Sequence, residues 1–187
     1  MIERLSTTLQ GHLVTLEPLA PDHVNGLRAA ASDPRIWQWM WTTDFDTWLE
    51  RTPPDAASVA FVTCVEGTTL GSTSYLAVRP EHRVLEIGNT WLSPSAWSGG
   101  VNVEAKLLMM RHAFEVANCL RVEFKTDALN ERARAALAAL PAQFEGVHRK
   151  HMLVRGGEHR DSAWYSVIVD EWPEVRANLE RRLSHHL

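Results

Sequence analysis

The hydrophobic and polar positions of the N-terminal half predict one strand, short helices and then three more strands. Residues 11–19 alternate as a first strand. Short helical segments are expected at residues 22–31, after Asp33-Pro34 and at residues 43–51. Strands follow at residues 59–65, 70–78 and 84–92, the first two as an antiparallel hairpin. Gly88-Asn89 lies inside the last of these, where glycine commonly marks a bulge or a close approach to a ligand.

Helical spacing takes over after Pro94. Apolar residues recur every three or four positions in residues 100–118, which predicts a long amphipathic helix. A strand at 121–126 precedes a helix capped by Asn130, whose buried stripe is expected to comprise Ala133, Ala136, Leu137 and Leu140. Strands 143–154 and 160–168 form a closing hairpin, and a C-terminal helix starts at about residue 172. The order predicts one α+β domain, residues 1–187, with a mixed, mostly antiparallel sheet of about seven strands flanked by helices.

Composition narrows the class of protein. A chain of 187 residues can bury its own core, and Cys64 and Cys119 belong to no metal-like cluster, so we expect neither a disulfide framework nor a metal site. The N-terminus lacks the apolar core of a signal peptide, and no run of about 18 apolar residues occurs. We therefore interpret the chain as soluble and cytoplasmic, without a membrane partner. A net charge of −4 with interleaved signs gives no reason to expect nucleic acid as a partner.

Residues 97–105, WSGGVNVEA, lie where a strand gives way to the long helix. Small residues let the backbone close around a ligand, and the free N–H groups of a first helical turn favour a diphosphate. A glycine pair alone is weak support, because Gly99-Gly100 also suits a plain flexible turn.

Several motifs in order resemble the GNAT acyltransferases, in the branch that includes the ribosomal-protein N-terminal acetyltransferases. They are EIG at 86–88, WSGGVNVEA at 97–105, TDALNERA at 126–133 and FEG at 144–146. The resemblance spans roughly residues 9–172. It implies the GNAT fold and a transfer of an acetyl group from acetyl-CoA, as cosubstrate, to a primary amine of a small molecule or a protein N-terminus.

The resemblance also implies how the coenzyme binds. The diphosphate would be held by backbone amides of Ser98, Gly99, Gly100, Val101, Asn102 and Val103. The pantetheine arm would pair with Trp91, Leu92 and Ser93 in the gap between diverging fourth and fifth strands, with Asn130 on the far side. The sequence departs from the family pattern at Asn102, Ala133 and Pro141, where Gly or Ala, Ser and Gly are usual. Ala133 removes a hydroxyl sometimes proposed to protonate the departing thiolate.

Acyl transfer needs a base for the amine proton and a donor for the developing oxyanion. Glu86 is the first candidate for the base, because it opens the strand beside the cleft. The alternative is a strand-end carboxylate that bonds nearby backbone or pairs with an arginine. His151 and Asp161 are further candidates, although their segment also fits a solvated face. Tyr165 is a candidate proton donor or a core aromatic residue. Direct attack leaves Cys64 and Cys119 as structural residues.

The acceptor pocket is predicted from aromatic residues. Four of eight tryptophans fall between residues 37 and 48. If residues 36–41 are helical, Trp37 and Trp41 share a face while Trp39 points away, so at least one ring should line the acceptor pocket or the contact of a homodimer. Asn89 lies at the predicted bulge, where backbone N–H groups would meet the acceptor and the oxyanion.

Two other functions remain open. A catalytically silent GNAT domain would bind acyl-CoA as a sensor or interaction module, which fits Ala133. An unrelated α+β ligand-binding protein would leave Gly99-Gly100 without a ligand.

Overall fold

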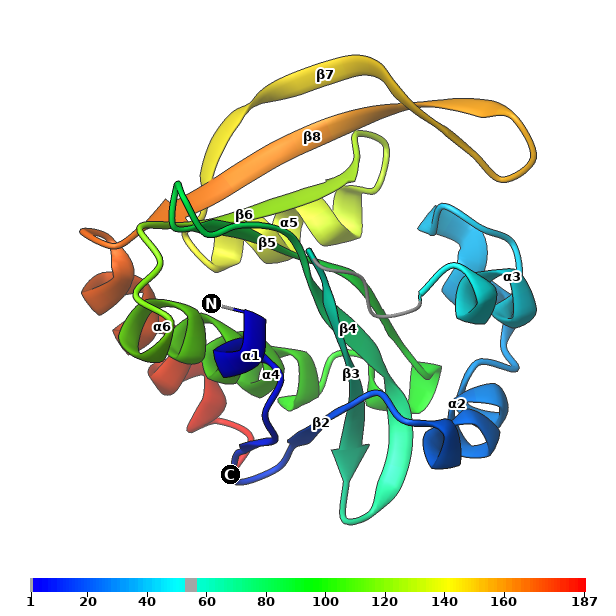
Figure 1. The fold of residues 1–187 in the computed structure, drawn as a ribbon, viewed down its shortest axis with the longest axis horizontal. Helices are drawn as coiled ribbons and strands as arrows, with labels where there is room; N and C mark the ends of the chain where they lie inside the picture. Colours follow the sequence, from blue (N-terminus) through cyan, green and yellow to red (C-terminus); the bar gives the residue numbers. More distant parts are fainter. Residues whose placement is uncertain (1, 53–56) are drawn as a thin grey trace.

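Eight strands form one mixed sheet in the computed structural model, which describes residues 2–52 and 57–187 (Figure 1). The strand order is β1-β2-β3-β4-β5-β6-β8-β7. The strands are β1 Leu9–Gln10, β2 Thr15–Pro18, β3 Val59–Val65, β4 Thr68–Arg79, β5 Val84–Leu92, β6 Arg121–Asp127, β7 Gln143–Val154 and β8 Glu158–Ile168. The short β1, which pairs with β2, adds one strand to the seven or so predicted. The predicted α+β class, with one mixed sheet flanked by helices, is confirmed.

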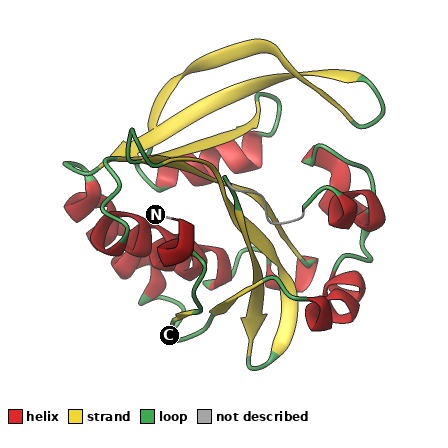
Figure 2. Cartoon of the chain, in the orientation of Figure 1, coloured by secondary structure: helices red, strands yellow, loops and turns green. Residues whose placement is uncertain are grey.

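Helices cover both faces of the sheet (Figure 2). The α-helices are α1 Ile2–Leu5, α2 Val24–Ala30, α3 Phe45–Glu50, α4 Val101–Arg111, α5 Glu131–Ala139 and α6 Trp172–Leu183. Shorter turns are η1 Pro21–His23, η2 Pro34–Trp39, η3 Pro94–Ala96 and the π-helical η4 His112–Val116. In the described ranges no helix is long and apolar enough to cross a membrane.

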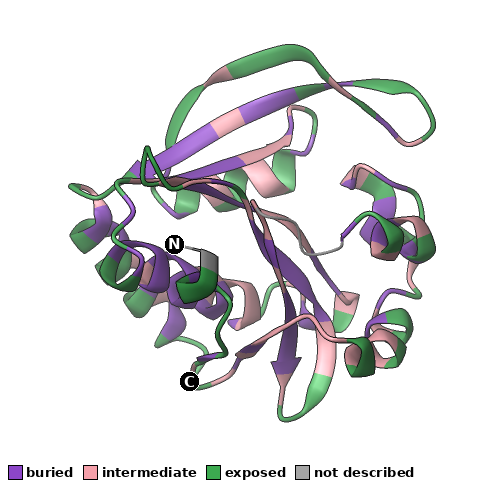
Figure 3. Ribbon diagram, viewed as in Figure 1, coloured by how far each residue is buried: buried purple, intermediate pink, exposed green. Residues whose placement is uncertain are grey.

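Two hydrophobic cores lie on opposite faces of the sheet. The larger one joins the sheet to α1, α4 and α6, and Met109, Met110 and Leu85 are fully buried in it. The smaller one lies under α2, η2 and α3, with Trp48 at its centre. The middle strands are buried, whereas β7 at the sheet edge is largely exposed (Figure 3). The middle of the sheet is therefore a rigid base for a site.

The sheet opens between β5 and β6, which are the one parallel pair among the described strands. Their register runs only from Val84↔Arg121 to Glu86↔Glu123. Beyond it β5 continues to Leu92 and β6 to Asp127, so that the two strands separate (Figure 1). These strands are the fourth and fifth of the sequence-based prediction.

A β-bulge shapes β5 beside this gap. Ser72 pairs with Trp91 and Ser74 with Gly88, which leaves Asn89 and Thr90 opposite the single residue Thr73. Asn89 has a φ of +49°, a left-handed value that asparagine tolerates better than most residues. The bulge predicted at Gly88-Asn89 is therefore present and centred on Asn89 and Thr90.

The first strand is shorter than predicted because a buried carboxylate takes its donors. Both oxygens of Glu104, on α4, accept hydrogen bonds of 2.7 Å from the N–H groups of His12, Leu13 and Val14. Those amides cannot pair in the sheet, so β2 begins at Thr15. Glu104 thereby ties the N-terminal segment to the start of α4.

The long helix predicted at residues 100–118 changes form along its length. Regular α4 ends at Arg111 and continues as the π-turn His112–Val116. His112 lies 2.6 Å from the carbonyl oxygen of Arg4, and Glu115 accepts from the indole of Trp172 at 2.9 Å. The wider turn thus brings two polar side chains to the segments that pack on this end of the helix.

Candidate functional site

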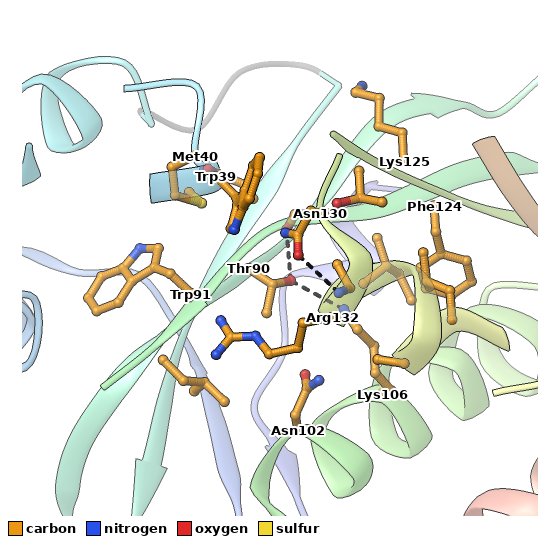
Figure 4. Close-up of a pocket in the computed structure, with 18 of the residues that line it drawn as sticks. Trp39, Met40, Thr90, Trp91, Asn102, Lys106, Phe124, Lys125, Asn130 and Arg132 are labelled. Atoms are coloured by element: carbon orange, nitrogen blue, oxygen red, sulfur yellow. Dashed lines mark hydrogen bonds between the residues drawn. The ribbon is translucent and has the colours of Figure 1, made fainter. Parts of the chain in front are cut away.

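A pocket of about 880 Å³ occupies the gap between β5 and β6; we call it the central pocket. Its walls come from β5 and its bulge, the start of α4, β6, α5 and η2, with the hairpin β7–β8 at one end (Figure 4). Among the labelled residues, Thr90 and Trp91 belong to β5, Asn102 and Lys106 to α4, and Asn130 and Arg132 to the start of α5.

One end of the central pocket is the N-terminus of α4. No described side chain caps α4 at Gly100, so the N–H groups of its first turn keep free donor capacity. Ser98 has a φ of +62° in the turn that leads into the helix. Asn102 points into the pocket, and its buried Oδ1 has no hydrogen-bond partner among the described residues. Free amides at the positive end of a helix dipole fit a diphosphate.

Seven of the ten residues expected to bind coenzyme line this pocket: Trp91, Leu92, Ser98, Gly99, Asn102, Val103 and Asn130. Ser93, Gly100 and Val101 are not among its described lining residues. Gly100 is buried beneath the loop, where an added Cβ would lie 2.8 Å from Leu13 Cδ1 and 2.9 Å from His186 Cβ. Gly100 therefore serves close packing, whereas Gly99 is open, with its nearest such neighbour at 3.8 Å.

The apolar stripe of α5 lines the central pocket, and only its Leu137 and Leu140 also meet the larger core, which corrects the prediction of a buried stripe. Ala133, Ala136 and Leu137 line the pocket, and Ala136 is exposed. Leu140 alone of the four is buried. Asn130 caps the helix as predicted, because its Oδ1 accepts from Ala133 N–H at 3.0 Å. Its side chain therefore holds α5 in place at the pocket edge.

Two guanidinium groups stack on Trp97 at the same end. Arg132 lies 4.2 Å and Arg35 5.3 Å from the ring centroid, and the indole N–H donates to the carbonyl oxygen of Leu92 at 2.9 Å. The Trp97 ring thus holds two cationic side chains, one from η2 and one from α5, beside the N-terminus of α4. Neither arginine was predicted from sequence, since stacking joins segments about a hundred residues apart.

Lys106 is another residue that sequence reasoning missed. It follows Asn102 by one helical turn and lines the central pocket, where its Nζ donates to Thr90 Oγ1 at 3.2 Å (Figure 4). Burial lowers the pKa of Lys106 to about 8, although the charge of Glu86 opposes the shift. The sequence signal for Lys106 was its spacing from Asn102, because residues four apart lie on the same face of a helix.

Glu86 is the one predicted catalytic residue that lines the central pocket. Its side chain is 2% exposed, and its Oε2 accepts a 2.6 Å hydrogen bond from Lys125 Nζ. The partner is thus a lysine of β6, where sequence reasoning considered an arginine. A buried, ion-paired carboxylate is suited to accept a hydrogen bond from an incoming amine.

His151 and Tyr165, the other two catalytic predictions, lie outside the described lining of the pocket. His151 is exposed on β7, and its Nδ1 lies 3.0 Å from Ser162 Oγ. Burial against its neighbours, with Lys125 nearby, lowers its pKa. Tyr165 is buried, and its hydroxyl accepts from Arg134 Nε at 3.2 Å. Asp161, a weaker candidate, is exposed and accepts from the backbone N–H of Lys150.

The tryptophans divide between core and pocket. Trp37 is buried, with its indole N–H donating to Ala31 O at 3.2 Å and its ring 5.7 Å from that of Trp91. Trp39 and Trp41 are half-buried and line the central pocket. The predicted sharing of one helix face by Trp37 and Trp41 is wrong, because the 3₁₀ turn η2 ends at Trp39.

Asn89 fixes the aromatic wall to the bulge. Its Oδ1 accepts from the indoles of Trp41 and Trp48 at 3.0 and 3.2 Å, and its amide nitrogen lies 3.4 Å from Thr52 Oγ1. It lines the pocket as predicted, but its side chain is engaged in positioning two rings.

Known proteins share this architecture. A family model described as an acetyltransferase (GNAT) domain matches residues 14–142. A GCN5-related N-acetyltransferase from Brucella melitensis is 28% identical with a TM-score of 0.89, over 95% of this chain and 86% of that one. A T. thermophilus protein assigned to the acetyltransferases is 38% identical with a TM-score of 0.87, over 94% of this chain and 96% of that one.

More distant structures share the fold as well. Mycobacterium smegmatis RimJ, solved in complex with CoA-disulfide, has a TM-score of 0.78 at 20% identity, over 96% of each chain. Curated proteins give no match. Because the family model spans more than half of the residues and the fold agrees with it, the chain belongs to the GNAT family of N-acetyltransferases.

Proposed function

We propose that the protein binds acetyl-CoA in the central pocket and transfers its acetyl group to a primary amine that enters beside Glu86. The observation that carries this proposal is the pocket itself: it runs from the uncapped start of α4, through the opening between β5 and β6, to a buried carboxylate. The orphaned Oδ1 of Asn102 and the two arginines on Trp97 supply polar and cationic partners for a phosphorylated coenzyme. RimJ, solved in complex with CoA-disulfide, shares the fold.

The transfer needs no covalent enzyme intermediate. The amine nitrogen attacks the thioester carbonyl carbon, the C–S bond breaks, and CoA leaves as a thiolate. Glu86 is placed to accept the amine proton, directly or through a water, while N–H groups of the β5 bulge are candidates for the oxyanion donor.

Lys106 is our candidate for the proton that the thiolate receives. Ala133 offers no hydroxyl, and the hydroxyl of Tyr165 is engaged by Arg134. Lys106 lines the same pocket, and a pKa of about 8 makes its ammonium a better acid than an ordinary lysine. The proton it gives up returns from solvent.

Acetyl-CoA should raise the melting temperature, because a ligand of the folded state stabilises by mass action. Gly99→Glu places a negative charge beside the diphosphate site at an open position, so it should abolish most of the rise, while the equally large Gly99→Gln should keep more of it. Equal shifts in both variants would place the diphosphate elsewhere.

A silent binding domain is the second candidate, and Ala133 is the residue that favours it. Release of free CoA with a panel of primary amines separates the two, since a sensor would be stabilised by acetyl-CoA without releasing thiol. The cytoplasmic location and the homodimer stay predictions.

A further inference from the structure

Arg160 is a buried cation in the central pocket without a partner in the described ranges. It lies near the start of β8, opposite Met152 on β7, is 7% exposed and lines the pocket. Its guanidinium makes no hydrogen bond or ion pair with the side chain or backbone of another described residue, and its Nε is buried without a partner. A guanidinium has five donors in a fixed fork, so leaving it dry and unpaired is costly.

The nearby carboxylates are already engaged. Glu86 pairs with Lys125 at 2.6 Å. Asp127 lies 3.4 Å from Arg155, which also pairs with Glu158 at 2.9 Å. Burial lowers the pKa of Arg160, but a guanidinium stays charged at any ordinary pH. The carboxylates nearest Arg160 are thus held by other cations, and the charges of Asp127 and Glu86 act on its guanidinium only from beyond ion-pair distance.

Strand geometry places Arg160 on the side of Glu86. Trp164 pairs with Lys125 across the β6–β8 ladder, and Arg160 lies four residues before Trp164, so the alternation of a strand gives it the same face of the sheet as Lys125. Lys125 contacts Glu86. The opposite face carries Tyr165, which contacts Arg134 of α5. Arg160 thus belongs with the acceptor side of the pocket and not with the α4 terminus, where the diphosphate is proposed.

We propose that the acetyl acceptor carries an anionic group, a carboxylate or a phosphate, which binds the guanidinium of Arg160 while its amine lies at Glu86. The inference rests on the proposed function. A planar guanidinium matches two oxygens of either anion, and Trp39 and Trp41 offer flat apolar surface to the rest of the molecule. An unmodified hydrophobic peptide N-terminus offers carbonyl oxygens but no anion to pair with this guanidinium.

Matched amines test the proposal. The probes are β-alanine, 4-aminobutyrate, L-phenylalanine and 4-(aminomethyl)benzoate, each beside its carboxamide and its phosphonate analogue, with CoA release as the readout. For at least one skeleton an acid should exceed its carboxamide at least about tenfold in kcat/KM, because a buried donor left unpaired rejects the uncharged analogue. Preference for the carboxylate or for the phosphonate identifies which anion the site takes.

Arg160→Gln should remove that preference by lowering kcat/KM for acids at least about tenfold and for carboxamides less than about twofold. Arg149→Gln, at an exposed position of β7, is the matched control and should change neither. The melting temperature of Arg160→Gln, with and without acetyl-CoA, guards against a folding defect; an arginine without structural partners predicts a Tm no lower than wild type and an unchanged coenzyme shift.

Three results would overturn the anion site: equal use of acids and carboxamides, a preference that persists in Arg160→Gln, or an Arg160→Gln protein that is destabilised as strongly as it is inactivated. Acetyl-CoA binding with no turnover of any probe would also count against it. A wild-type protein that does not bind acetyl-CoA would instead refute the proposed function as a whole.

Discussion

Lys125 Nζ donates a 2.6 Å hydrogen bond to Glu86 Oε2 across the point where β5 and β6 begin to separate. The last parallel register pair is Glu86↔Glu123, two residues before Lys125 on β6. The ion pair therefore joins the two strands at the closed end of the gap that holds the central pocket. Glu86 stays buried there as one half of a pair while it lines the central pocket.

Glu86→Gln is expected to lower kcat by about 10²–10⁴-fold, the range typical of a lost general base. The shift in melting temperature caused by acetyl-CoA should remain, because the side chain acts on the amine. Lys125→Met tests the ion pair instead of the base. It leaves the Glu86 carboxylate buried and unpaired, which should cost about 3 kcal/mol of folding stability. Steady-state kinetics and urea unfolding measure the two effects. A Glu86→Gln enzyme with normal turnover would leave the amine proton to water.

Glu104→Gln should destabilise the fold although its size is unchanged. The carboxylate accepts from three N–H groups at 2.7 Å, and an amide would turn an NH₂ toward at least one of those donors. A loss of about 2 kcal/mol is expected in urea unfolding. Coenzyme affinity should fall too, since Leu13 packs beside Gly100 at the start of α4. Glu81→Gln, on an exposed turn, is the control, and identical midpoints for both variants would contradict this role of Glu104.

Local patterns predicted the elements around the site better than its charges. Alternation located β5 at Val84–Leu92, and Gly88-Asn89 indicated its bulge. Asn130 was recognised as a cap by its position before a helix. The same helical spacing predicted all four residues of the α5 stripe as buried, although only Leu140 is, because apolar residues that line a pocket and apolar residues that fill a core have the same period.

Partners distant in the chain could not be predicted. Whether Glu86 pairs with a lysine or an arginine depends on the register of β5 with β6, 39 positions away. Arg160 carries no local signal, since a basic residue near a strand end is usually solvated. Trp37 and Trp41 were assigned one face on the assumption of an α-helix, and the 3₁₀ turn that ends at Trp39 gives them different surroundings.

Lys106→Met should stabilise the protein at neutral pH. A pKa lowered from 10.5 to about 8 corresponds to about 3 kcal/mol at most. Below pH 8 the lysine is charged in both states, and the folded state bears the full desolvation cost. Between about pH 8 and 10.5 the unfolded chain binds the proton more tightly, so this cost fades as pH rises. The gain in Lys106→Met should therefore shrink over that window.

The difference between variant and wild type is the quantity to measure, by urea unfolding from pH 7 to 10. Burial raises the pKa of Cys119 to about 11, so the folded state loses stability through this thiol as pH rises. The loss is the same in variant and wild type, and the difference between them therefore does not contain it. Lys150→Met, at an exposed site, should show no such difference. A gain that is constant with pH would mean that Lys106 is not desolvated. Turnover of Lys106→Met should fall if this lysine supplies the thiolate proton.

Substitutions of the tryptophans distinguish rings that stabilise the core from rings that bind the acceptor. Trp37→Ala removes a buried ring whose indole donates to Ala31 and which packs against Trp91, so unfolding should become easier by about 3–5 kcal/mol. Trp39 is half-buried on the pocket wall, and Trp39→Ala should change stability by less than about 1 kcal/mol.

Trp39→Ala should instead raise the acceptor KM about tenfold, because it takes apolar surface from the wall that faces the amine, with coenzyme affinity kept. Light scattering on the same variant separates a pocket role from an interface role: an unchanged mass supports the pocket, whereas a fall from dimer to monomer would place Trp39 in a subunit contact. Asn89→Ala frees the indoles of Trp41 and Trp48 from their shared oxygen and should raise the same KM without touching Trp39. If Trp39→Ala unfolds as readily as Trp37→Ala, its ring belongs to the core and the aromatic wall is structural.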